Sequence, residues 1–396
     1  MSLLKGVKVL DLSRLLPGSY ATQYFADLGA DVIKVEDTDK GDYSRDFGTN
    51  IKDMGSFYWT TNWRKKSISI NLKSQEGLRI FYRLCENADV IFENFKPGTV
   101  KRLKVDWDTI RKINPKIVYC SLTGYGQSGE LKDRAGHDIN YLSLSGILHL
   151  MGPSPEDQPV IPGTQIADLG AGLSAALGII TGLYTRERTG KGIHIDASFY
   201  DTMCSWMMIP LIEYFASGNK PKRGSDMLNG GNICYNIYPT KDGKYMAVGA
   251  LEEKFWIRTC EVLGLTDLKL HRNTLAVESN PYYMKLKNCF LTKTQDDWKK
   301  FFQHEDCCVT PVLDIQQVIN DKHFVDRGIL EDVHDEQHSF LPKVRSPLVF
   351  NNHYDKVIDL SDSLPPSLGE NTKDLLMEYG YTSVEIEEWY SKGVIK

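Results

Sequence analysis

The first 37 residues carry the pattern of a strand, a helix and a second strand. The segment VKVLDLS (Val7–Ser13) is typical of a buried strand, the next run has helical spacing up to Gly29, and DVIKVED (Asp31–Asp37) is a second β-rich run. A start of this kind is the first unit of a doubly wound parallel sheet. The loop RLLPGSY lacks the G-x-G-x-x-G fingerprint, so a nicotinamide or flavin cofactor is not indicated.

The alternation of strands and helices continues beyond this unit. SISINL alternates like a strand, EGLRIFYRLCENA has the spacing of an amphipathic helix, and DVIFENF and KIVYCSLTGYG are further strand candidates. Residues 41–62 are instead rich in glycine and aromatic residues without a clear period, which predicts a long loop with a functional role. We therefore expect an α/β fold in which residues 1–215 form a large Rossmann-like domain with a parallel sheet.

The character of the chain changes near residue 217. GNKPKRGSDMLNGG resembles a linker, and CYNIYPTKDGKYMAVGAL contains two alternating runs around a Lys-Asp-Gly turn, the signal of a β-hairpin. Helical segments rich in charge and tryptophan follow the hairpin. We expect residues 225–325 to form a smaller α+β domain and residues 326–396 to return to the large domain.

Charge and cysteine usage narrow the classes of partner and compartment. A net charge of −5 argues against a general nucleic-acid binder or a membrane-surface protein, but it permits a local basic groove. The eight cysteines are scattered without a C-x-x-C pair, so free thiols in a reducing compartment are expected rather than a metal site or disulfide framework. We find no signal peptide, no transmembrane run and no lipidation motif, and we expect a cytoplasmic protein.

Several residues offer groups for proton transfer, and each also has a purely structural explanation. His137 and Asp138 head an apolar, helix-like run, and Asp168 stands just before a helix rich in small residues. Asp168 is also a suitable helix cap, a role worth ~1 kcal/mol of stability. Glu252, at a loop-to-helix boundary, could serve the helix dipole alone. Residue types by themselves leave both roles open.

A basic turn follows the strand DVIFENF. Lys96, Lys101 and Arg102 surround the turn and the helix start after it. They form either a solvated basic face or a phosphate clamp at the carboxyl edge of the sheet, where helix N-termini help to hold anions.

The whole chain resembles the class III CoA-transferase superfamily. The shared segments are LGADVIKVE, ENFKPGTVKRL, LTGYGQSG, the stretch around Asp168, TGKGIHIDASFYD and DGKYMAVGALE. Within the superfamily the chain is most similar to the α-methylacyl-CoA racemase branch, on AGHDINYLSLSGIL, the MLNGG run and CCVTPVLD. The histidine of GHDINYL is the specific signal, because the transferases generally lack it.

This resemblance implies roles for individual residues. His137 and Asp168 correspond to the two proton-transfer residues, and Glu252 to a carboxylate that hydrogen-bonds the histidine. The residues implied to bind the CoA thioester are Arg102, Lys96, Lys34 and Asp138. The resemblance also implies an interlocked homodimer in which Glu252 serves a site across the interface. The substrate is then an acyl-CoA, and no cofactor is needed.

Racemisation explains why these residue types are needed. Inverting a stereocentre without a cofactor requires one base on each face of a planar enolate, so His137 would remove a proton while protonated Asp168 delivers one, and the reverse. The pKa of Asp168 must then be raised, which burial can do. Peptide N–H groups where Asp168 enters its helix are expected to stabilise the enolate oxygen, a contribution of ~3 kcal/mol per well-placed donor.

Three departures from the racemase pattern keep a second activity open. Thr164 stands where an asparagine is expected, Asp37 replaces a basic residue expected after the second strand, and the loop at 41–62 resembles that of the transferases. Transferases use the equivalent of Asp168 as a nucleophile that forms an acyl-aspartyl anhydride and then an aspartyl-CoA thioester. The sequence predicts a 2-methylacyl-CoA racemase, with CoA transfer between carboxylic acids as the alternative.

Overall fold

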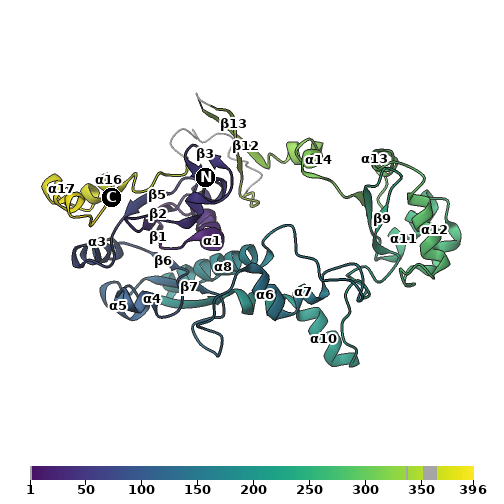
Figure 1. The fold of residues 1–396 in the computed structure, drawn as a ribbon, viewed down its shortest axis with the longest axis horizontal. Coiled ribbons are helices and arrows are strands. Elements are labelled where there is room, and N and C mark those ends of the chain that lie inside the picture. The colour runs from purple at the N-terminus through teal and green to yellow at the C-terminus, as the bar shows by residue number, and fades with distance from the viewer. Residues whose placement is uncertain (1, 336–337, 351–363) are drawn as a thin grey trace. The chain divides into compact units, whose positions relative to one another are not determined.

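The computed structural model describes residues 2–335, 338–350 and 364–396 (Figure 1). The chain divides into two compact units. The large unit comprises residues 1–145, 164–205 and 328–396, and the small unit comprises residues 146–163 and 206–327. Compared with the boundaries expected from the sequence, the small unit begins earlier and also takes up residues 146–163, which separate His137 from Asp168 along the chain.

A six-stranded sheet forms the centre of the large unit, with the strand order β5-β2-β1-β6-β7-β8. Every neighbouring pair in this sheet is parallel, and Leu10 of β1 pairs with both Ile33 and Ile91. Its strands are β1 (Lys8–Asp11), β2 (Asp31–Glu36), β5 (Lys66–Ser69), β6 (Val90–Glu93), β7 (Val118–Thr123) and β8 (Ile193–Ser198). The α/β class predicted from the strand–helix alternation is confirmed.

Helices cover both faces of this sheet. On one face, α1 (Leu15–Asp27) packs on β1 and β2, α8 (Ile166–Thr189) packs on β7 and β8, and the two helices pack against each other. On the other face, residues of α3 (Gln75–Cys85), α5 (Trp107–Ile113), α16 (Thr372–Glu378) and α17 (Ser383–Ser391) join Leu10, Ile33 and Ile91 in one buried cluster. The C-terminal helices therefore belong to the core of the large unit.

The segment at 41–62 is more ordered than its sequence pattern predicts. It contains a 3-10 turn η1 (Tyr43–Asp46), a small hairpin of β3 (Asn50–Ile51) and β4 (Met54–Gly55), and α2 (Ser56–Thr61). Asp42 caps η1 by accepting the N–H of Ser44, and Arg45 pairs with Glu36 at 2.7 Å. Hydrophobic periodicity does not detect polar caps of this kind. The prediction that residues 41–62 form a long loop without secondary structure is therefore wrong.

The small unit contains a three-stranded antiparallel sheet and most of the remaining helices. Its strand order is β11-β10-β9, and the predicted hairpin joins β9 (Tyr235–Pro239) to β10 (Tyr245–Gly249) through Gly243, at φ 75°. Trp256, Trp298 and Phe290 are fully buried in its core. Its other elements are α7 (Ile147–Leu150), α10 (Met208–Ser217), α11 (Glu253–Val262), η2 (Thr266–His271), α12 (Pro281–Phe290), α13 (Gln295–Phe302), β11 (Val309–Pro311), α14 (Ile315–Ile319) and α15 (Lys322–Asp326).

Four connecting elements complete the large unit. They are α4 (Thr99–Arg102), α6 (Asp138–Ser145), α9 (Phe199–Trp206), of which Trp206 already falls in the small unit, and the hairpin of β12 (Leu330–Asp335) and β13 (His338–Val344). Among the described helices, α8 is long and apolar enough to cross a membrane by length and composition. Its packing on β7, β8 and α1 accounts for that apolar character, because a helix in the middle of a core is also apolar.

Candidate active site at the junction of two helices

The start of α8 is held by a residue from another helix. The Oδ2 atom of Asp138, in the first turn of α6, accepts the backbone N–H of Ala167 at 2.6 Å and that of Asp168 at 3.1 Å. The residue at the N-cap position of α8, Gln165, makes no side-chain cap bond. Asp138 therefore caps α8 across the fold, and the alternative in which Asp168 caps its own helix is wrong.

This contact brings the two ends of the predicted proton-transfer pair together. His137 lies directly before α6; its backbone N–H donates to Oδ1 of Asn140 at 3.0 Å, and its carbonyl accepts the N–H of Asn140 at 2.8 Å. The side chain of His137 is exposed in the isolated chain. Because Asp138 follows it directly and binds the Asp168 backbone, His137 and Asp168 are joined through a single intervening residue.

Asp168 sits in an environment that disfavours its charged form. Burial and, second, the negative charge of Asp138 raise the pKa of Asp168 to about 7. A carboxyl group with such a pKa is about half protonated at neutral pH, so it is able either to donate or to accept a proton. The sequence-based requirement for a raised pKa at Asp168 therefore has a physical cause in this structure.

The expected oxyanion donors are occupied. The N–H groups of Ala167 and Asp168 go to Asp138, and that of Leu169 goes to the carbonyl of Gln165 at 3.0 Å. These three N–H groups at the point where Asp168 enters its helix are therefore not free to bind an enolate oxygen in this structure, contrary to expectation. What remains at this position is the positive end of the α8 dipole.

Aromatic packing fixes the turn that carries His137. The hydroxyl of Tyr141 donates to the carbonyl of Gly136 at 2.7 Å, while its ring stacks on Phe199 and meets Tyr125 edge-on. Tyr141 is buried. The turn and α6 are therefore tied to β7 and α9, which limits the positions available to the His137 backbone.

Close packing between α8 and α1 explains the small residues of α8. A side chain at Gly172 would place its Cβ atom 2.7 Å from the carbonyl oxygen of Pro17, a distance that requires the backbone to move. The loop before α1 is itself fixed: the N–H of Leu15, at φ 64°, donates to Asp42 at 2.9 Å, and Asn94 hydrogen-bonds both backbone groups of Arg14. Asp138 of α6 thus braces the first turn of α8, and α1 packs closely against the following turn.

Lys34 lies among carboxylates inside the large unit, which does not fit the CoA-binding role that the resemblance implies for it. Its side chain is completely buried, and its Nζ atom lies 2.8 Å from Asp42 and 3.9 Å from Asp11. Lys65 joins the same cluster at 3.3 Å from Asp11. Burial would raise the pKa of Asp42, but Lys34 foremost among its partners brings it down to about 2. This cluster holds the α1 loop in place beneath the surface.

The basic turn after β6 is open to solvent. Lys96 and Arg102 are exposed, and Arg102 contacts the Thr99 hydroxyl at 3.2 Å. After β2, which β1 separates from β6 in the sheet, Asp37 stands where a basic residue was expected, and the structure places Arg14 beside it, 2.6 Å from its carboxylate. A cation from the loop before α1 therefore lies beside Asp37, a pairing that sequence spacing does not reveal.

Glu252 belongs to the small unit, whereas His137 and Asp168 belong to the large unit. It occupies the N-cap position of α11 without making a side-chain cap bond, and it is exposed. Burial and then the charge of Glu252 raise the pKa of Cys308, which places the two side chains near each other. Glu252 makes no capping hydrogen bond, while its place at the start of α11 remains consistent with the alternative that it serves the helix dipole.

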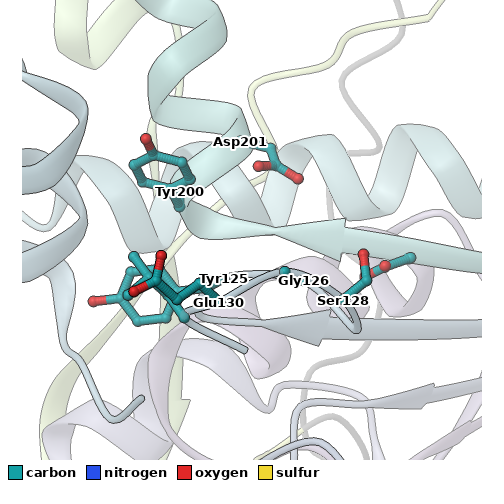
Figure 2. A pocket seen from close by; sticks show the side chains of 9 residues that line it. Tyr125, Gly126, Ser128, Glu130, Tyr200 and Asp201 are labelled. Carbon is teal, nitrogen blue, oxygen red and sulfur yellow. The ribbon is translucent and has the colours of Figure 1, made fainter. Parts of the chain in front are cut away.

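A cavity of about 260 Å³ lies at the ends of β7 and β8. The loop after β7 contributes Tyr125 and Glu130 to its wall, and α9 contributes Tyr200 and Asp201 (Figure 2). Asp196 also lines it, and its carboxylate accepts the N–H of Gln127. Three carboxylates make this cavity unsuitable for a phosphate. Within the described residues, no group of three histidine, cysteine, aspartate or glutamate side chains is placed to hold a metal ion.

The large unit combines a parallel sheet with a carboxyl group held at a helix start and a histidine beside it. These are features of an α/β enzyme with an acid–base site. The model of CoA-transferase family III matches residues 4–372, and the chain belongs to that family.

Relatives with two different activities match almost the whole chain. The α-methylacyl-CoA racemase of Homo sapiens is 35% identical over 406 residues, 99% of this chain and 97% of that protein. The succinyl-CoA:glutarate CoA-transferase of Mus musculus is 33% identical over 405 residues, 100% of this chain and 91% of that protein. A crystal structure of a CAIB/BAIF family protein from Brucella suis has a TM-score of 0.81 at 30% identity, covering 95% of this chain and 99% of that one.

Proposed function

We propose that the protein is a racemase of 2-methylacyl-CoA thioesters that needs no cofactor. The observation that carries the proposal is the link from His137 through Asp138 to Asp168, the last with a pKa of about 7. Inversion through an enolate requires a proton acceptor on one face of the α-carbon and a proton donor on the other. The resemblance of GHDINYL to the racemase branch supports the same activity.

In this mechanism the two residues act on opposite faces of the substrate. His137 takes the α-proton of one epimer, and the electron pair of the broken C–H bond moves into the thioester as an enolate. Asp168 then donates its proton to the α-carbon from the other face, leaving a carboxylate and an imidazolium. The reverse reaction begins from that state, so neither residue needs an external oxidant or reductant.

We propose in addition that the enzyme is a homodimer in which Glu252 completes the site of the partner subunit. The support is an exposed apolar row on α8, formed by Leu173, Leu177, Ile180 and Tyr184. Their spacing of four, three and four residues puts them on one helix face, and an unpaired apolar face of this kind marks an interaction surface. A second copy of the chain would cover it, and would bring a small unit with its Glu252.

CoA transfer is the second candidate, and two observations favour it. A transferase matches the full chain at 33% identity, and the sequence of residues 41–62 resembles the corresponding transferase loop. In that reaction ionised Asp168 attacks the donor thioester, which gives an acyl-aspartyl anhydride and the CoA thiolate. The thiolate then attacks the aspartyl carbonyl, which releases the donor acid and leaves an aspartyl-CoA thioester for the acceptor acid. This reaction uses Asp168 equally well but gives no role to His137.

Deuterium exchange tests the first proposal. One epimer of a 2-methylacyl-CoA is incubated with the enzyme in deuterated water, without an acceptor acid. We expect uptake of one α-deuterium together with loss of optical purity. If neither occurs while donor thioester and acceptor acid together yield a hydroxylamine-trapped adduct on Asp168, the protein is a transferase and the racemase proposal fails.

A further inference from the structure

We infer that Asp138 is a positioning residue that fixes the first turn of α8 relative to His137 and holds a second negative charge beside the Asp168 carboxylate. The inference rests on the proposed role of Asp168, but not on the choice between racemisation and CoA transfer. It also replaces the role in substrate binding predicted for Asp138, since an anionic side chain already committed to two peptide N–H groups is a poor partner for a CoA phosphate.

The geometry supports a capping role that no other residue in the described part of the chain fills. One oxygen of Asp138 accepts two successive N–H groups, of Ala167 and Asp168, at 2.6 and 3.1 Å. Hydrogen bonds to an ionised acceptor are about twice as strong as neutral ones. Because Gln165 makes no cap bond, removing the Asp138 carboxylate would leave both donors without these acceptors. The position of the α8 start therefore depends on the residue that follows His137.

Among the groups around Asp168, Asp138 has the largest electrostatic effect on the pKa of Asp168. From α6, Asp168 is faced by Asp138 and by Tyr141, whose own pKa is raised mainly by burial. From α1, Tyr20 lies against Gly172, one turn further along α8. Among the described residues, Asp138 is the one whose charge raises the pKa of Asp168, in addition to burial. A neutral residue at position 138 should therefore shift the titration of Asp168 toward lower pH.

The two contributions of Asp138 are separable by substitution. Asp138→Asn keeps an oxygen that can accept the N–H groups and removes the charge, and Asp138→Ser does the same with a shorter side chain. Asp138→Ala removes both the charge and the cap. Asp106→Asn is the matched control, because Asp106 caps α5 in the same unit through the N–H of Thr109, away from α8.

The test measures the titration of Asp168 directly. The full-length protein is treated with a water-soluble carbodiimide and an amine across a pH series, since the reagent couples to protonated carboxyl groups, and modified Asp168 is quantified by peptide mass spectrometry. We expect a midpoint near pH 7 in the unmodified sequence. Asp138→Asn should lower it by ~1 pH unit, and Asp106→Asn should leave it unchanged.

Several outcomes would overturn the inference. An unchanged midpoint in a folded Asp138→Asn protein would exclude the electrostatic role, and Asp138→Ser provides the same test if the asparagine variant does not fold. Equal unfolding midpoints for Asp138→Ala and the unmodified protein would exclude the cap. Because the labelling needs no turnover, it distinguishes a failure of this inference from a failure of the proposed racemase activity, which the deuterium experiment reports.

Discussion

The Oδ2 atom of Asp138 lies 3.1 Å from the backbone nitrogen of Asp168, although 30 residues separate them in the chain. This one hydrogen bond connects the helix that begins after His137 with the helix that carries the acid expected to work with it. It also sets two carboxyl groups side by side, which is unfavourable unless one of them is protonated. This unfavourable interaction between the two carboxyl groups is confined to the position where a proton-transfer residue is needed.

His137→Ala should abolish racemisation while leaving the fold intact, because the imidazole is exposed in the isolated chain. Loss of a general base costs about 10²- to 10⁴-fold in rate. The measurement is α-deuterium uptake from deuterated water, with circular dichroism to check folding. Transfer of CoA between acids by the variant at the original rate would instead point to the transferase chemistry.

Asp168→Asn should stabilise the protein increasingly as the pH rises. The folded-state pKa of Asp168 is raised from 3.8 to about 7, so between these values the folded state binds more protons than the unfolded state and its stability falls with rising pH. Asparagine removes this penalty. We expect the difference in melting temperature between variant and unmodified protein to grow from about pH 4 to about pH 7 and then level off. A constant difference would contradict the raised pKa.

Lys34→Ala should lower the free energy of unfolding of the large unit rather than weaken substrate binding. The substitution leaves Asp11 and Asp42 buried with one cation fewer, and breaking a buried ion pair costs ~3–5 kcal/mol. Urea denaturation measures the loss. Lys66→Ala is the control on the adjacent strand, because its ion pair with Asp31 is substantially exposed and should cost less than ~1 kcal/mol.

Arg14→Ala should raise the KM for acyl-CoA with a smaller effect on kcat, if Arg14 replaces the cation missing at Asp37. The same direction is expected for Arg102→Ala, and both effects should shrink at high salt because exposed charges are screened. Steady-state kinetics at two ionic strengths measures them. Arg111→Ala removes an exposed cation paired with Asp108 on α5 and should leave KM unchanged. An equal rise in all three variants would indicate a loss of overall positive charge rather than a specific contact.

Local patterns predicted much of the fold, because each strand and helix of a parallel sheet leaves its own periodicity. The strand–helix–strand start, the hairpin at Gly243 and the α/β class all follow from neighbouring residues. Local sequence also indicated His137 and Asp168 as candidate site residues, since a histidine in GHDINYL and an aspartate before a small-residue helix are recognisable along the chain. It missed the order in residues 41–62, where polar caps and buried tryptophans replace a regular period.

Only the tertiary structure decided what these residues contact. The sequence on its own left open whether Asp168 caps its own helix. The resemblance gave Lys34 a role in CoA binding, and Asp37 stood in the place of an expected basic residue. Folding instead buries Lys34 between two aspartates, places Arg14 beside Asp37 and gives the cap of α8 to Asp138. Apart from the pair of Lys34 and Asp42, these contacts join residues more than 20 positions apart. The sequence determines which groups are present, but the burial and pairing that set their charge arise only when distant helices and strands pack together.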